Sequence, residues 1–101
     1  MLRVQIYTTA AGVSVQAIEF SGYNGASIAE WTKGYHFLPE PYAKDDIWPE
    51  YVEFPTFHDM RMKAYKKDMV IYCEIDDAFY ALPRNNFIEF YAATGVWETV
   101  N

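Results

Sequence analysis

The stretch from Asp68 to Tyr91, DMVIYCEIDDAFYALPRNNFIEFY, limits the possible folds of this chain more than any other part of the sequence. Every second residue from Met69 to Ile75 is apolar, which is the period of a β-strand with one buried face. Asp76 and Asp77 interrupt the run, and aspartate favours tight turns because its side chain bonds nearby main-chain amides. The strand pattern resumes from Phe79 to Leu82, so the sequence predicts a β-hairpin here.

The end of this stretch predicts a third strand. Pro83 has no amide hydrogen for a sheet, so it is expected to close the second strand or to lie on an edge. The polar triplet 84–86 predicts a second turn. Residues 87–92 are rich in aromatic and β-branched types, which favours a strand over a helix.

The remaining chain adds further short strands. The apolar side of the segment 13–20 changes near Ala17, which indicates either a bulge or a strand buried on both faces. The tail from Thr94 to Asn101 is expected to form a last strand or to dock on a second copy of the chain. Alternation and strand-forming residues predict the other strands over 2–7, 13–20, 35–38 and 51–54.

A short helix is predicted between Asn24 and Gly34. Asn24 is suited to cap its first turn with a side-chain hydrogen bond. Gly34 is suited to the left-handed conformation that ends many helices. Ile28 and Trp31 are three residues apart, so they share a face that can anchor the helix to the sheet.

These elements predict a single domain, residues 1–101, of the α+β class. We expect one short α-helix on a bent antiparallel β-sheet of about five to seven strands, or a small open barrel with the helix at one end. Aromatic residues make up 19% of the chain, so we expect self-association as a homodimer that covers part of the aromatic surface. The predicted core residues are Val4, Ile6, Val15, Ile18, Phe20, Ile28, Trp31, Ile71, Cys73, Ile75, Phe79, Ala81 and Phe90.

Composition narrows the function. The net charge of −6 argues against direct nucleic-acid binding and against an anionic membrane surface, because both need a basic footprint. Cys73 is the one cysteine, so no disulfide forms within the chain. The first residues lack the long apolar core of a signal peptide, and no run approaches the ~20 apolar residues of a membrane span. A cytoplasmic protein is expected.

The segment 39–59 combines acidic residues, aromatic residues and prolines. Prolines lower the entropy lost on binding, and Trp and Tyr are frequent anchors of protein interfaces. We therefore predict a partner-binding element, with a loop that covers a sheet edge as the alternative. The residues predicted to contact the partner are Tyr42, Asp45, Asp46, Trp48, Glu50, Tyr51 and Glu53.

A basic group follows directly. Such side chains could bind the phosphates of a small anionic ligand, for example a nucleotide-type signal. The alternatives are a solvated strand end, or a group that balances the acidic segment within the chain or in a dimer. The residues of this second candidate site are Arg61, Lys63, Lys66 and Lys67.

No motif indicates catalysis, a metal or a cofactor. His58 and Asp59 have no further ligand at a recognised metal spacing. Adjacent Asp76 and Asp77 fit a turn better than a pair of catalytic carboxylates, which must converge. Cys73 on an apolar strand is typical of a structural thiol. The sequence thus predicts a protein that is not an enzyme, with no metal site and no cofactor.

Two parts of the chain carry a family resemblance. The first is VQAIEFSG at 15–22 with Asn24, Ile28 and Trp31 after it, and the second is DMVI at 68–71. FYALP at 79–83 follows, with Phe87 and Tyr91. This pattern resembles small proteins encoded by tailed bacteriophages and prophages. Those proteins begin with a strand and an asparagine-capped helix, and continue with an aspartate-led strand, a phenylalanine–tyrosine–x–x–proline arm and a phenylalanine–x–x–x–tyrosine ending.

The resemblance covers about half of the chain and rests on structural residues. Lys67 and Met69 stand where those proteins have glycine and tyrosine, Ser21 stands where they have threonine, and 39–57 has no counterpart. The resemblance implies a phage accessory protein in the bacterial host cytoplasm, and it implies no reaction. We expect a protein that binds and inhibits a bacterial host or anti-phage defence protein. The alternatives are a sponge for a small anionic signal and a component of the virion or its assembly.

If the acidic segment binds the partner, Trp48→Ala should abolish binding, because a buried indole is a frequent interface anchor. The melting temperature should remain nearly unchanged. Capture assays together with thermal denaturation check both expectations. A large drop in the melting temperature would instead assign Trp48 to the core.

Overall fold

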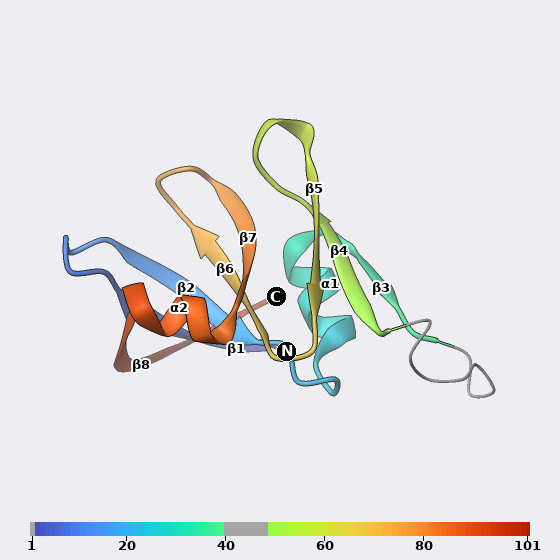
Figure 1. Ribbon diagram of the computed structural model, residues 1–101, viewed down its shortest axis with the longest axis horizontal. Coiled ribbons are helices and arrows are strands. Elements are labelled where there is room, and N and C mark those ends of the chain that lie inside the picture. The colour runs from blue at the N-terminus through green and yellow to red at the C-terminus, as the bar shows by residue number, and fades with distance from the viewer. Residues whose placement is uncertain (1, 40–48) are drawn as a thin grey trace.

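The computed structural model describes residues 2–39 and 49–101. The fold is α+β, as the sequence predicts, and the strands divide between two antiparallel sheets. In chain order, the described residues form β1 (Leu2–Thr8), β2 (Ser14–Glu19), α1 (Gly25–Thr32), β3 (Tyr35–Phe37), β4 (Tyr51–Pro55), the 3-10 turn η1 (Phe57–Asp59), β5 (Arg61–Tyr65), β6 (Asp68–Cys73), β7 (Ala78–Pro83), α2 (Arg84–Phe90) and β8 (Ala92–Val100) (Figure 1).

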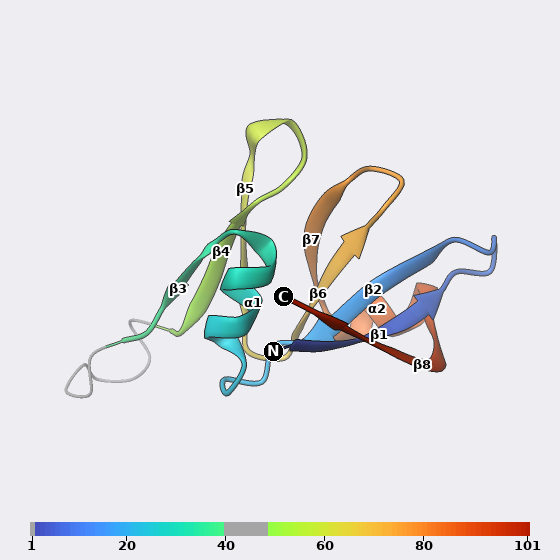
Figure 2. The same cartoon turned by 180° about the vertical axis from the view of Figure 1, so that it is seen from behind.

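The larger sheet has five strands in the order β7-β6-β2-β1-β8, and the smaller has three in the order β3-β4-β5. All pairings are antiparallel. Both sheets are open, and no closed barrel forms within the described parts of the chain. Figures 1 and 2 show α1 and the three-stranded sheet at one end of the molecule and α2 at the other.

One face of the five-stranded sheet is buried against α1 and the three-stranded sheet. Leu2, Val4 and Val70 lie in one cluster with Ile28 of α1 and Phe54 of β4. Trp31 packs against the edge of this cluster, with its ring 5.0 Å from that of Phe79. The predicted anchoring of the helix by Ile28 and Trp31 is therefore confirmed.

The opposite face carries a second cluster, covered by α2. Val15 and Ala17 lie in it, whereas Ile18 and Phe20 belong to the first cluster. β2 is thus buried on both faces, and its pairing with β1 and β6 runs without a register shift. Of the two interpretations of the change near Ala17, the strand buried on both faces is therefore confirmed, and the bulge is not.

The prediction of a turn and a strand over 84–92 is wrong, because residues Arg84–Phe90 form α2. Phe87 is fully buried, with its ring 4.5 Å from that of Tyr91 and 4.8 Å from that of Tyr7. Residues four apart share one side of a helix, so Phe87 and Tyr91 both meet the sheet. Packing of this pair overrides the strand propensity of the segment. Phe90 points outward and is 65% exposed.

Two details of α1 also differ from expectation. Asn24 makes no side-chain cap, and its amide instead accepts a hydrogen bond from the Ser21 amide and donates one to the Glu19 carbonyl. The left-handed residue at the other end is Lys33, not Gly34. Gly34 is needed for space, because a Cβ there would collide with Glu53 and Phe54 of β4. Ile75, predicted for the core, lies exposed in the β6–β7 turn.

No helix in the described residues is long and apolar enough to cross a membrane.

The reassignment of residues 84–90 predicts unequal effects of two phenylalanine truncations. Phe87→Ala should lower the free energy of unfolding by about 3–5 kcal/mol, because it leaves a cavity under α2. Phe90→Ala, on the outer side of the same helix, should change it by no more than about 0.5 kcal/mol. Urea denaturation measures both. The reverse order would place Phe90 in the core and restore the strand.

Candidate functional site

The outer side of the three-stranded sheet carries a row of aromatic rings. Val52 and Phe54 of β4 point into the core, so the alternate residues of each strand point outward. The register places Phe37, Tyr51 and Tyr65 side by side across β3, β4 and β5. The rings of Phe37 and Tyr51 stack at 4.9 Å, and those of Tyr51 and Tyr65 lie 6.1 Å apart.

A second row beside it mixes aromatic and charged groups. Tyr35, Glu53 and Lys63 are opposite one another in the register. Lys63 places its ammonium 4.6 Å from the centre of the Tyr51 ring, which is a cation–π arrangement. Tyr35 is 59% exposed and Tyr65 is 40% exposed. We call Tyr35, Phe37, Tyr51, Glu53, Lys63 and Tyr65 the aromatic face.

The aromatic face has the chemistry of a protein interface. Tyrosine supplies a large apolar ring with a polar tip and few rotatable bonds, so it loses little entropy when it is buried by a partner. Arg61 lies at the border of the face, with its Nε 3.0 Å from Glu53 Oε1. Aromatic centres with arginine beside them are the composition typical of binding hot spots.

The seven residues predicted for partner binding divide into three groups. Tyr42, Asp45, Asp46 and Trp48 lie outside the described residues. Tyr51 and Glu53 lie on the aromatic face. Glu50 is buried, and its carboxylate oxygens lie 2.7 Å from His36 Nε2 and 3.6 Å from Lys66 Nζ. Its contacts are therefore with β3 and with the β5–β6 turn, which gives it a structural role.

The four residues predicted for an anionic ligand do not form one cluster. Arg61 and Lys63 border or belong to the aromatic face, while Lys66 and Lys67 lie in the β5–β6 turn. Arg61 is paired with Glu53, and Lys66 is paired with Glu50. Basic and acidic groups thus balance each other within the chain, which is one of the alternatives that the sequence left open.

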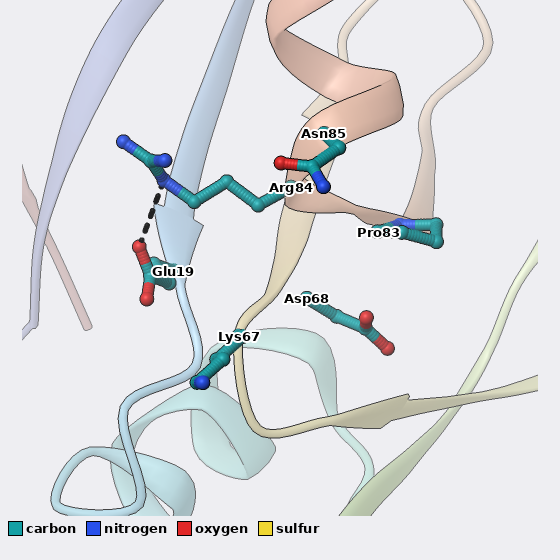
Figure 3. Close-up of a pocket in the computed structure, with 6 residues that line it drawn as sticks. All are labelled: Glu19, Lys67, Asp68, Pro83, Arg84 and Asn85. Atoms are coloured by element: carbon teal, nitrogen blue, oxygen red, sulfur yellow. Dashed lines mark ion pairs between the residues drawn. The ribbon is translucent and has the colours of Figure 1, made fainter.

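Lys67 lines a separate concavity of about 520 Å³ between the ends of β2, β6 and α2. Its charged neighbours are Glu19, Asp68 and Arg84, and Arg84 Nε lies 3.2 Å from Glu19 Oε1. Figure 3 shows Arg84 reaching across to Glu19, with the Lys67 and Asp68 side chains pointing away from each other. Two acidic and two basic groups give this hollow no net attraction for an anion.

A smaller hollow of about 210 Å³ lies along β6 and β7, with Cys73, Tyr80 and Leu82 in its wall. Burial raises the pKa of the Tyr80 phenol, and Asp76 raises it further. Beyond this hollow, the hydrogen bond from the Tyr72 hydroxyl to Asp77 at 2.7 Å raises the pKa of Tyr72. Both phenols stay protonated at neutral pH, as unperturbed tyrosine side chains also do.

The described residues contain no group of three or more His, Cys, Asp or Glu side chains that could hold a metal ion. Comparison with known protein families, with curated proteins and with solved structures finds no significant match to this chain.

Sequence reasoning missed Tyr35, Phe37 and Tyr65 as candidate site residues. Each lies on a short strand whose alternate residues point inward, YHF in β3 and RMKAY in β5. Alternation within the strands was the available signal. The register that joins the strands depends on pairing across long separations, so the sequence did not place the three rings beside Tyr51.

The different surroundings of Glu50 and Glu53 predict different costs of neutralising them. Glu50→Gln should lower the free energy of unfolding by about 1.5–3 kcal/mol, because it removes buried charge-assisted contacts to His36 and Lys66. Glu53→Gln should cost no more than about 0.5 kcal/mol, since its pair with Arg61 is partly solvated. Urea denaturation compares the two variants. A negligible cost at Glu50 would return its carboxylate to the list of partner contacts.

Proposed function

We propose that this chain is a non-enzymatic bacteriophage accessory protein that binds and inhibits a bacterial host or anti-phage defence protein. The phage origin is supported by the resemblance at 15–31 and 68–91. Binding is supported by the aromatic face, where Tyr35 and Tyr65 remain exposed. On the other side of the same sheet, the side chains of Val52, Phe54 and Ala64 are fully buried in the core. This exposed aromatic row is the observation on which the proposal rests.

The sequence between β3 and β4 contains four of the predicted partner contacts, Tyr42, Asp45, Asp46 and Trp48, which lie outside the described residues. The described residues on either side of it follow Phe37 and precede Tyr51, and these two are neighbours in the aromatic row. The partner-binding residues expected from the sequence in this segment would then act together with the aromatic face. An acidic protein of this kind selects a partner with a basic surface, since complementary charge speeds association.

The anionic sponge has weaker support. Arg61 and Lys66 are engaged with carboxylates, and Lys63 lies over Tyr51. A phosphate would have to displace these contacts before it could bind.

Paired surface variants test the proposal. Tyr35→Thr with Tyr65→Thr removes two exposed rings from the aromatic face and keeps a residue that favours strands. We expect the double variant to retain its fold and to bind its bacterial partner at least about tenfold more weakly, as for the loss of interface anchors. Affinity capture from a bacterial lysate with quantitative mass spectrometry names the partner, and calorimetry then measures both affinities.

The control carries Ile88→Ala with Phe90→Ala on the outer side of α2, at the other end of the molecule. It should recover the partner as well as the unchanged protein does. Equal losses in both variants would show that the aromatic face is not the contact surface. A bound compound of small mass in native mass spectrometry, with no protein partner, would favour the sponge.

A further inference from the structure

β8 ends the five-stranded sheet with an edge that nothing in the described residues covers. It pairs with β1 on one side only. All nine residues except Val100 are exposed, including Val96 at 55% and Trp97 at 49%. In Figure 2, β8 runs in front of β1, and the sheet order places it at the edge. Half of its main-chain amides and carbonyls therefore point away from the sheet.

The opposite edge of the same sheet is covered. The hydroxyl of Thr56 donates to the carbonyl of Phe79 in β7, and the amide of Ala81 in β7 donates to the Met62 sulfur at 3.0 Å. Side chains of the β4–β5 hairpin thus satisfy outward polar groups of β7. β8 has no such neighbour within residues 2–39 and 49–101.

β8 also lacks most of the features by which edge strands avoid pairing with other chains. It contains no lysine, arginine or proline. Its one irregularity is at Gly95, where Thr94 donates its hydroxyl to the Ile6 carbonyl at 2.7 Å and holds the bulge in place. From Trp97 to Val100 the pairing with β1 is regular. β8 remains a strand on both sides of the bulge, and its outer edge from Ala92 to Val100 has no partner strand within the described residues.

We propose that β8 pairs antiparallel with β8 of a second copy, which joins the two five-stranded sheets into one continuous sheet. A two-fold axis makes such an edge self-complementary, because each strand offers its partner the same donors and acceptors. In an antiparallel pair, directly opposite residues point to the same face of the sheet, whereas successive residues of one strand point to opposite faces. The two-fold axis must therefore place one residue directly opposite the same residue of the second copy.

Glu98, the one charged residue of β8, distinguishes between two registers of the proposed strand pair. An axis at Glu98 would place two carboxylates opposite each other, which is unfavourable. An axis at Trp97 places the two indoles opposite each other, and aromatic cross-strand pairs are favourable. Arg3 lies 5.5 Å from the centre of the Trp97 ring on the same chain, which is a cation–π arrangement. In this register Val96 is opposite Glu98 of the second copy.

Two variants of opposite charge at one position test both the dimer and its register. Val96 is exposed in the single chain, so Val96→Lys and Val96→Glu should both keep the melting temperature of the monomer. Val96→Glu should weaken the dimer at least about tenfold, because two carboxylate pairs become opposed. Val96→Lys should keep or tighten it, since each lysine meets Glu98 of the second copy. Sedimentation equilibrium measures the dissociation constants.

A cysteine test is independent of the charges. In a Cys73→Ser background, Trp97→Cys places two thiols at the axis, and oxidation should link the copies. Thr99→Cys should not link them, because its opposite residue is Gly95 of the second copy. A protein that stays monomeric at all concentrations would overturn the proposal. A dimer that responds equally to both Val96 variants and links through neither cysteine would overturn it too.

Discussion

Burial of β2 and β6 on both faces is the constraint from which the rest of the structure follows. Val15 and Ala17 point to one side of β2, and Ile18 and Phe20 point to the other. A strand with apolar side chains on both faces cannot belong to a sheet that leaves one face in water. Each face of the sheet must therefore pack against another layer of the protein. α2 provides one cover. The other consists of α1 and the three-stranded sheet, which share a single cluster with the five-stranded sheet.

The second cover explains why the aromatic face exists. Val52, Phe54 and Ala64 all point inward to meet the five-stranded sheet. Strand alternation then forces their neighbours outward, and at these positions the chain has Tyr51 and Tyr65. The stacked pair of Phe37 and Tyr51 and the tilted contact between Tyr51 and Tyr65 stabilise the sheet by side-chain contacts across its strands. Such exposed aromatic rows cost little in folding and remain available for a partner.

The sequence predicts the fold class and most strands because these depend on local alternation, as in Met69 to Ile75. α2 escaped prediction because Phe87 to Tyr91 contains good strand formers, although the i,i+4 spacing of Phe87 and Tyr91 was already helical. The ion pair between Glu50 and Lys66 escaped for a different reason. It joins residues whose proximity depends on the β4–β5 register, and registers are set by the whole sheet.

The two edge strands of the five-stranded sheet differ in whether other groups bond their unpaired main-chain amides and carbonyls. At β7 the covering side chains come from Thr56 and Met62, on a hairpin already held in place by the shared core. The same hairpin cannot also reach β8, which lies four strands away in the sheet order. The element that follows β7 is α2, and it covers a face and not an edge. An antiparallel strand from a second copy, as proposed above, would satisfy that edge with no further element of this chain.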